Sequence, residues 1–175
     1  MNIHIDKLNP NKTKPIFDHS KIDGRKSLAY NFVDRTLTDS EYLAIEKLCL
    51  QMGSTMIQSD GIGLALPQIG IFNGRLFIIR DFTENMIQAF FNPTYSPDTI
   101  EKESQIEGCL SVRKTTSQLF SIERPISIKA TWYHLEPTKN FSKREETLTG
   151  PRARIFMHEY DHLQGISIVN KYKKK

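Results

Sequence analysis

The spacing of apolar residues predicts an amphipathic helix after a polar first segment. From Leu37 onward, apolar residues recur at three- and four-residue steps, the period of one face of an α-helix. Thr38 and Glu41 have the spacing of a capping box, so this helix should begin after Thr38, and its pattern ends near residue 58. Its apolar face comprises Tyr42, Ile45, Cys49, Met52 and Met56. Cys49 is therefore expected to be a buried packing residue.

Runs of β-branched and aromatic residues predict short strands in the middle of the chain. Residues 75–81 are mostly apolar without alternation, which is typical of a strand buried on both faces. A second strand is expected at 89–93 and should stop at Pro93, which has no N–H for the ladder. Further strands are expected around 101–105, 121–131 and 145–148, and their short separations favour antiparallel pairing.

A second helix is predicted over residues 150–165, and it carries His158, Glu159 and His162 in the pattern H-E-x-x-H. Two histidines one turn apart leave the same helix face, which is the geometry that two ligands of one metal ion need. Glu159 is badly aimed for a ligand but well placed as a general base towards a metal-bound water. The pattern also occurs by chance on solvated helices, so a metal site requires a third ligand.

The third ligand must come from upstream, because the thirteen residues after His162 include no His, Cys, Asp or Glu. Cys109 is the first candidate, since it follows Gly108 and a thiolate with two imidazoles suits a first-row metal. His134 competes with it, as do Asp and Glu residues, but its surroundings are typical of a strand end and surface turn.

Residues 61–70 contain three glycines and a proline, which exclude a regular helix and allow a backbone or ligand to approach closely. Gln68 is the one side chain of this run with both donor and acceptor atoms, and on local grounds it is a turn-stabilising amide.

The order of helix, strands and helix indicates the α+β class, with short antiparallel sheets packed around a central metal-binding helix. The 175 residues suit one domain, 1–175, whose first 35 residues form an irregular arm without an assigned function.

Three separated stretches together resemble the motifs of the peptide deformylase family. Residues 61–70 are similar to its first motif, G-x-G-L-A-A-x-Q-x-G, and residues 107–111 are identical to its second, E-G-C-L-S. Residues 158–165 are similar to its third, which contains H-E-x-x-H. Three motifs in the right order make a specific match, which covers roughly residues 38–170 by pattern but not the first 35 residues.

The resemblance implies a metal-dependent catalytic centre. Cys109, His158 and His162 would bind one divalent metal ion, with Fe²⁺ as the first expectation and Zn²⁺ as the second, and a water would complete the coordination. Glu159 would take a proton from that water and later protonate the leaving amine.

The resemblance also implies the substrate and the residues that bind it. The Gln68 side chain and the Leu110 backbone N–H would form an oxyanion hole, and the backbone of Ile62, Gly63 and Gly108 would bind the peptide like an added strand. The substrate would be an N-formyl-methionyl nascent peptide and the products formate and a free amino terminus.

Several positions depart from the family pattern. Leu66 replaces an alanine and is expected to narrow or reshape the groove, Met157 replaces a glutamine, and Arg113-Lys114 stands where a proline or glycine is common. The family's usual downstream arginine has no clear equivalent, and Arg124 is the nearest candidate. These departures leave two alternatives: a related hydrolase of another small amide, and a metal-binding relative with little or no turnover.

Composition adds constraints on location and partners. The chain has no membrane-length apolar run and no signal peptide, and its two cysteines do not form a disulfide framework, so a reducing, cytoplasmic location is expected. The net charge of +4 comes partly from Lys171–Lys175. This tail is expected to be a solvated end, with transient ribosome contact as the alternative; neither DNA nor membrane is an expected partner.

Overall fold

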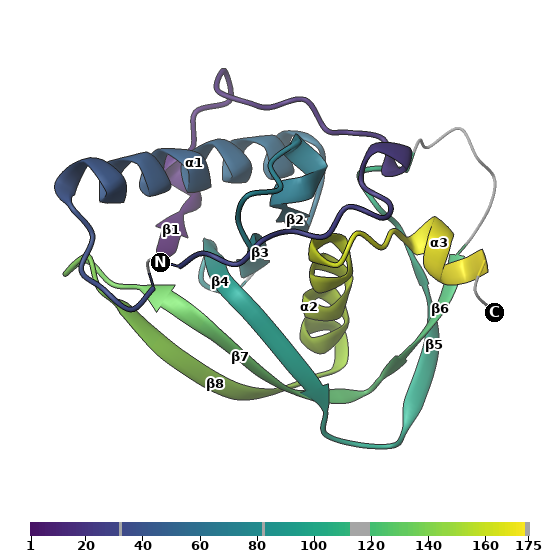
Figure 1. The fold of residues 1–175 in the computed structure, drawn as a ribbon. Helices are drawn as coiled ribbons and strands as arrows, with labels where there is room; N and C mark the ends of the chain where they lie inside the picture. The colour runs from purple at the N-terminus through teal and green to yellow at the C-terminus, as the bar shows by residue number, and fades with distance from the viewer. Residues whose placement is uncertain (32, 82, 113–119, 174–175) are drawn as a thin grey trace.

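The secondary structure combines helices with antiparallel strands, which confirms the α+β class (Figure 1). The computed structural model describes residues 1–31, 33–81, 83–112 and 120–173. Its helices are α1 (Asp39–Gln58), α2 (Gly150–Leu163) and α3 (Ile168–Lys173), with the 3-10 helices η1 (Ile5–Lys7), η2 (His19–Lys21) and η3 (Leu66–Ile69). Helices α1 and α2 pack against opposite faces of the strands: α1 shares an apolar cluster with Ile78 and Ala89, and α2 shares another with Phe77 and Phe90. None of the helices in the described ranges is long and apolar enough to cross a membrane.

An antiparallel sheet of six strands forms the larger layer. Its order is β2-β3-β4-β7-β8, and β1 pairs with β4 at the end that β7 leaves open. The strands are β1 (Asn2–His4), β2 (Gly63–Ala65), β3 (Leu76–Asp81), β4 (Met86–Pro97), β7 (Ser127–Leu135) and β8 (Phe141–Thr149). Strand β2 is the end strand of this sheet and lies within the glycine-rich segment 61–70. This segment therefore contributes an edge of the sheet.

Two of the strand predictions had wrong bounds. Strand β4 continues through Pro93, because its register with β7 shifts between Phe91 and Thr94 and the proline lies in that irregularity. The segment 121–131 is not a single strand. It divides into β6 (Phe120–Pro125) and β7, which belong to different sheets.

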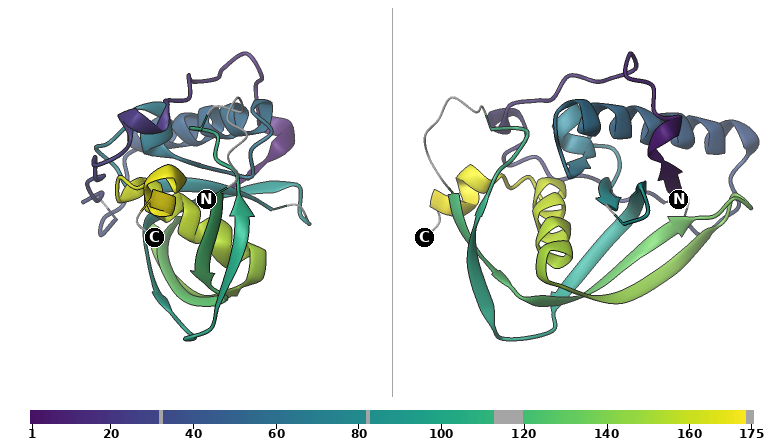
Figure 2. Two further views of the ribbon diagram at one scale, coloured as in Figure 1. Left: turned by 90° about the vertical axis from the view of Figure 1, so that its right-hand side faces the viewer. Right: turned by 180° about the vertical axis from the view of Figure 1, so that it is seen from behind.

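A second, two-stranded sheet lies beside α2 and is formed by β5 (Lys102–Glu107) and β6. Helix α3, which the sequence pattern did not predict, packs on β6 where Ile168 meets Phe120 and Ile122 in a small apolar cluster. Figure 2 shows this hairpin and α3 together on one side of the molecule. The hairpin is therefore a separate sheet next to α2, the helix that carries His158 and His162.

Helix α1 begins and ends where the sequence predicted. The Glu41 backbone N–H donates to Thr38 Oγ1 at 3.3 Å, and the Thr38 N–H donates to Glu41 Oε2 at 2.9 Å, which completes the capping box. Cys49, Met52 and Met56 are fully buried in the core. Burial raises the pKa of the Cys49 thiol to about 12, so this cysteine is a packing residue, as predicted.

Helix α2 is held by an aromatic cluster on its apolar side. The ring of Phe156 packs edge-on against Phe77 and Phe90, with centroids 5.0 and 5.5 Å apart. Burying one such side chain contributes about 1.5–3 kcal/mol. Because this side of α2 is fixed in the core, the orientation of its histidines on the other side is fixed as well.

The first 35 residues are less irregular than predicted. They contain β1, and the side chains of Ile3, Ile22 and Val33 are buried. Arg25 places its guanidinium carbon 3.6 Å from the centre of the Phe72 ring. These contacts were not predictable from the sequence pattern, because Ile3 and Ile22 are single apolar residues between polar neighbours.

Candidate metal centre and substrate groove

Helix α2 presents two imidazoles to one point, as its H-E-x-x-H spacing requires. The rings of His158 and His162 have centroids 5.0 Å apart and are nearly perpendicular. Pro151 lies in the first turn, where a missing N–H costs nothing, and Gly165 takes a φ of 70° just beyond the last turn. Both histidines are therefore carried by a well-defined helix.

Cys109 comes from the loop after β5 and completes the cluster. Its Sγ lies 3.3 Å from His162 Nε2, and the ligand atoms of Cys109, His158 and His162 all lie within 4.8 Å of one another. His134, the competing candidate, lies on β7 with its ring against the amino nitrogen of Met1, so it is not part of this cluster.

The donor set fits a divalent transition metal. One thiolate and two imidazoles leave an open position in a tetrahedral geometry, which is the arrangement of catalytic rather than structural sites. The His158 Nδ1 lies 2.9 Å from Glu107 Oε2, which leaves the other ring nitrogen for a metal. Glu159 Oε2 is buried and has no hydrogen-bond partner among the described residues, as expected for a carboxylate oxygen that faces a bound water.

Glu159 is a buried carboxyl group beside the two histidines. Only 4 % of the residue is exposed, and burial raises the pKa of this carboxyl to about 7. Gly63 lies directly against it, since a Cβ at Gly63 would lie 2.4 Å from Glu159 Oε1. A group with this pKa is able both to accept and to return a proton near neutral pH.

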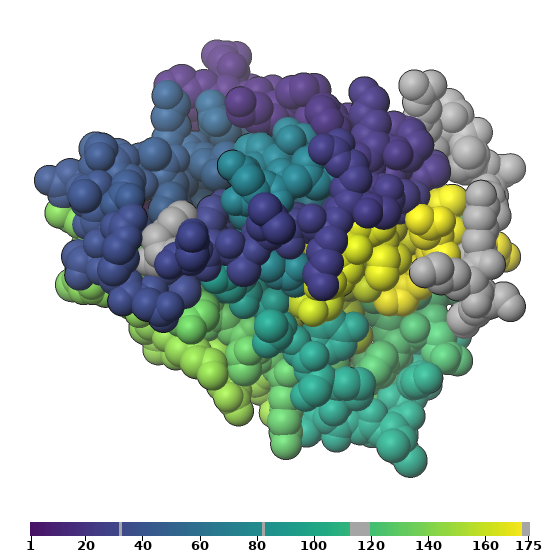
Figure 3. Space-filling model, in the orientation of Figure 1, coloured from purple at the N-terminus to yellow at the C-terminus, as the bar shows by residue number. Residues whose placement is uncertain are grey.

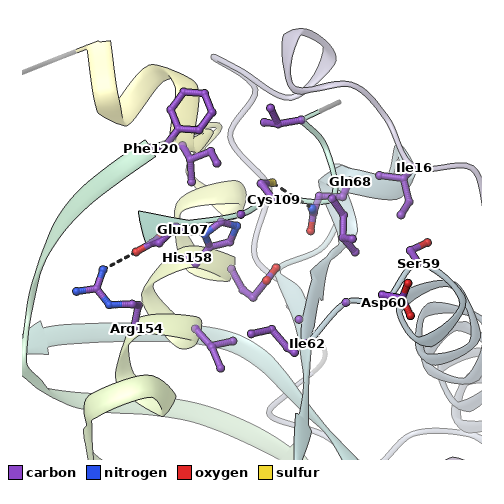
Figure 4. Close-up of a pocket in the computed structure, with 18 of the residues that line it drawn as sticks. Ile16, Ser59, Asp60, Ile62, Gln68, Glu107, Cys109, Phe120, Arg154 and His158 are labelled. Atoms are coloured by element: carbon purple, nitrogen blue, oxygen red, sulfur yellow. Dashed lines mark hydrogen bonds and ion pairs between the residues drawn. The ribbon is translucent and has the colours of Figure 1, made fainter. Parts of the chain in front are cut away.

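The Gln68 side chain contacts both the local turn and the cluster of Cys109, His158 and His162. Its Oε1 accepts a hydrogen bond from the Ala65 N–H at 2.8 Å, so the amide stabilises the turn into η3. Its Nε2 faces Cys109 and Ser111, 3.8 Å from Cys109 Sγ and 3.3 Å from Ser111 Oγ. The turn contact fixes the orientation of the amide, so its N–H groups face the centre (Figure 4).

Glu107 is the hub of an ion-pair network that sequence reasoning missed. Its Oε1 accepts from Arg124 Nε at 2.5 Å and from Arg154 Nη1 at 2.7 Å, while its other oxygen contacts His158. Arg124 is also 2.8 Å from Asp161 and is 1 % exposed. Burial acts to raise the pKa of Glu107, but the hydrogen bonds from Arg124 and His158 outweigh it and lower that pKa well below its usual range. Arg124, the nearest candidate for the family's downstream arginine, therefore connects Glu107 to helix α2 through Asp161.

A cavity of about 720 Å³ is lined by Cys109, His158 and Glu159. Ile62, Gly63 and Gly108, which are predicted to bind substrate, line this cavity together with Leu110, which is predicted to contribute to the oxyanion hole. A Cβ at Gly108 would meet nothing within 4 Å, which indicates open space in front of that backbone. Figure 4 shows Ile62, Cys109 and His158 among the residues that surround this cavity.

Two positions that depart from the family pattern, Leu66 and Met157, do not line this groove. Leu66 does not line the groove and so does not narrow it directly; it is fully buried in the same apolar cluster as Met56. Met157 also packs in the core, against the aromatic side of α2. Arg113 and Lys114 lie outside the described residues.

The site combines three residues that could hold a metal ion, an adjacent buried carboxyl group and a groove, an arrangement typical of metal-dependent hydrolases. The model of the polypeptide deformylase family matches residues 33–175. The chain belongs to the polypeptide deformylase family, whose members are metal-dependent hydrolases.

Individual relatives agree with this assignment. The peptide deformylase of Christiangramia forsetii is 34% identical over 148 residues, which cover 76% of this chain and 71% of the relative. That of Desulforudis audaxviator is 37% identical over 135 residues, covering 75% of this chain and 82% of the relative. The structure of a peptide deformylase from Synechococcus elongatus superposes with a TM-score of 0.73 at 25% identity, over 92% of this chain and 84% of that one.

Proposed function

We propose that this protein removes the formyl group from N-formyl-methionyl nascent peptides. The observation that carries the proposal is the cluster of Cys109, His158 and His162 at the base of a groove that also holds the buried Glu159 carboxyl and the Gln68 amide. A purely structural metal site needs neither a buried general base nor an aligned amide donor. Family membership supports the same reaction.

Cys109, His158 and His162 would hold one divalent metal ion, which supplies Lewis acidity that lowers the pKa of water towards about 7 and polarises a carbonyl. Fe²⁺ is the first candidate and Zn²⁺ the second, because a thiolate with two imidazoles accepts either. Glu107 supports the ligand role of His158 by fixing the ring through Nδ1.

The chain's own groups then move one proton and stabilise one charge. Glu159 accepts a proton from water as the water oxygen attacks the formyl carbon. The Gln68 Nε2 and the Leu110 N–H donate to the carbonyl oxygen as it gains negative charge, and such a donor is typically worth about 2.7–4 kcal/mol of barrier. The carbon–nitrogen bond breaks, Glu159 returns the proton to the leaving nitrogen, and formate and a free amino terminus are released.

The groove supports a peptide bound as an added strand. Strand β2 is the end strand of its sheet, so the edge at Ile62 and Gly63 is available to an extended backbone, and Gly108 lines the same groove. Contact between Gly63 and Glu159 leaves little room at the base. A formyl group, which has only hydrogen on its carbonyl carbon, suits this narrow end better than a larger acyl group.

The proposed substrate also bears on where the protein acts and on whether it contacts the ribosome. A nascent-peptide substrate implies action in the compartment where translation occurs, which we take to be the cytoplasm. Any ribosome contact through the basic tail would be weak and transient, because Lys171 Nζ is already 2.7 Å from Asp161. Sedimentation with ribosomes at increasing salt concentration tests this contact.

The decisive experiment compares the wild-type protein with Glu159→Ala after anaerobic purification. The variant should keep its metal and lose about 10²–10⁴-fold in formate release from formyl-Met-Ala-Leu. Formate release by the variant at the wild-type rate would overturn the mechanism. Hydrolysis of an acetylated peptide as fast as the formylated one would indicate the alternative amide hydrolase, and bound metal without any hydrolysis would indicate the binding protein.

A further inference from the structure

Part of the N-terminal arm lies directly on the site, although the family match begins only at residue 33. The Phe17 N–H donates to the Gln68 carbonyl at 2.7 Å, and the His19 N–H donates to the Ser111 carbonyl at 2.8 Å. These contacts join the arm to the two segments that contribute Gln68 and Cys109. Figure 3 shows the arm lying across the surface between the teal segment near residue 70 and the yellow C-terminal segment.

The arm is also held at Phe17 and on the C-terminal side of these contacts. A Cβ at Gly70 would lie 2.6 Å from the Phe17 ring, so the ring is packed tightly on the glycine-rich segment. Ile22 is fully buried, and Asp23 accepts hydrogen bonds from Ser167 at 2.9 and 3.1 Å. The backbone at Ile16 is therefore held in a defined place by neighbours on its C-terminal side.

Ile16 lines the same cavity as Ile62 and Gly63, next to Ser59 and Asp60 (Figure 4). Gly63 marks the inner end because it contacts Glu159. Asp60, with a φ of 56°, lies in the turn before β2, and Figure 4 shows it with Ser59 and Ile16 on the side of the cavity away from His158. An extended substrate with its formyl carbonyl at the metal cluster would place its methionine near Ile62 and its third residue near Ile16.

We propose that Ile16 is a specificity-determining residue that receives the side chain of the third residue of the formyl-methionyl peptide and favours an apolar one. The inference rests on the proposed function, because the direction of the peptide along the groove is taken from it. Ile16 is partly exposed, so an aliphatic side chain laid against it would remove apolar surface of both partners from water. The recognition would come from a segment that precedes the family match.

The test uses metal-loaded enzyme and three substrates: formyl-Met-Ala, formyl-Met-Ala-Leu and formyl-Met-Ala-Lys. Wild-type kcat/KM should be higher for the leucine peptide than for the lysine peptide. Ile16→Ala should lower kcat/KM for the leucine peptide by about fivefold, mainly through KM, and should change the value for the two-residue peptide less. Ile16→Glu should reverse the preference in favour of lysine, a gain that misfolding does not produce.

Ile100→Ala is the matched control, since Ile100 is 97% exposed and does not line the groove. It should show the wild-type preference. An unchanged leucine-to-lysine ratio in both Ile16 variants would overturn the inference while leaving the proposed function intact.

Binding of the product peptide Met-Ala-Leu, measured by calorimetry, supplies a readout that needs no turnover. Weaker binding to Ile16→Ala than to Ile100→Ala supports the inference even if formate is not released, in which case the proposed function alone fails. Equal binding to the two variants contradicts the inference.

Discussion

Gly63 and Glu159 are packed so closely that a Cβ at Gly63 would lie 2.4 Å from the glutamate Oε1 and 2.8 Å from its carboxyl carbon. Real Cβ atoms do not come this close, so a side chain at Gly63 must displace the carboxyl group. Gly63→Ala is expected to lower kcat by about 10²-fold or more, because the proposed base moves out of reach of the attacking water. Formate release and metal content together measure the effect, and the metal should be retained.

Gly108→Ala is the matched control for folding, because a Cβ at Gly108 meets nothing within 4 Å. Its unfolding temperature should equal that of the wild-type protein, whereas Gly63→Ala should unfold at a lower temperature. Wild-type turnover by Gly63→Ala would show that the carboxyl group is not required at its observed position.

The second prediction concerns the buried ion pairs of Arg124, which is 1% exposed and contacts both Glu107 and Asp161. Arg124→Met leaves two buried carboxylates without their main partner, and removing one member of such a pair typically costs about 3–5 kcal/mol. Urea denaturation should show this loss in the free energy of unfolding. Metal affinity should also fall, because Glu107 holds His158.

Arg144→Met is the matched control for this loss. Arg144 pairs with Glu136 at 2.7 Å, but its side chain is 52% exposed, so its removal should cost less than about 1 kcal/mol. If the two variants lose equal stability, the Arg124 network contributes no more than a surface pair.

The sequence was sufficient for elements whose causes are local. Helix α1 was predicted correctly because its capping box and its apolar face both depend on residues that are close together in the sequence. The helix that carries His158 and His162 was predictable for the same reason, and the choice of Cys109 over His134 needed only the donor chemistry and the neighbouring glycine. These features depend little on the rest of the fold.

Features that depend on distant partners were not predictable in this way. Pro93 signals a strand end, yet β4 continues because a register shift opposite β7 accommodates it. Pro125 ends β6 and separates it from β7, where the sequence pattern predicted a single strand. Nothing in the sequence indicates that Arg154 donates to the Glu103 carbonyl as well as to Glu107, since that requires knowing how β5 faces α2.

The third prediction concerns pH and the N-terminus of α1. The hydrogen bond from Arg35, with further ones from Thr38, lowers the pKa of Glu41 from 4.5 to about 2. A carboxyl group whose pKa is lower in the folded than in the unfolded protein stabilises the fold at pH values above its unfolded-state pKa. This contribution is lost as the pH falls from 4.5 to about 2. The stability difference between wild type and Glu41→Gln should therefore shrink over this range in urea denaturation.

Arg35→Met tests the stated cause of that pH dependence. Arg35 Nη1 and Nη2 lie 2.9 and 2.5 Å from the two Glu41 oxygens, so most of the shift should disappear with the guanidinium. The variant should lose much of the extra acid sensitivity while keeping the capping box. An Arg35→Met protein with the same pH dependence as wild type would contradict this account.

The fourth prediction separates the two cysteines by their reactivity. Cys49 is fully buried and burial raises the pKa of its thiol to about 12, whereas Cys109 is partly exposed in the groove. In metal-free native protein, a thiol reagent should therefore modify one cysteine rapidly, and Cys109→Ser should remove this fast phase. Addition of Zn²⁺ should slow modification of wild-type protein, because a ligated sulfur is not free to attack the reagent, and it should have no such effect on Cys49 in denatured Cys109→Ser. Rapid modification that Zn²⁺ does not slow would mean that the Cys109 sulfur is not a metal ligand, and the proposed function would then lose the donor on which its metal centre depends.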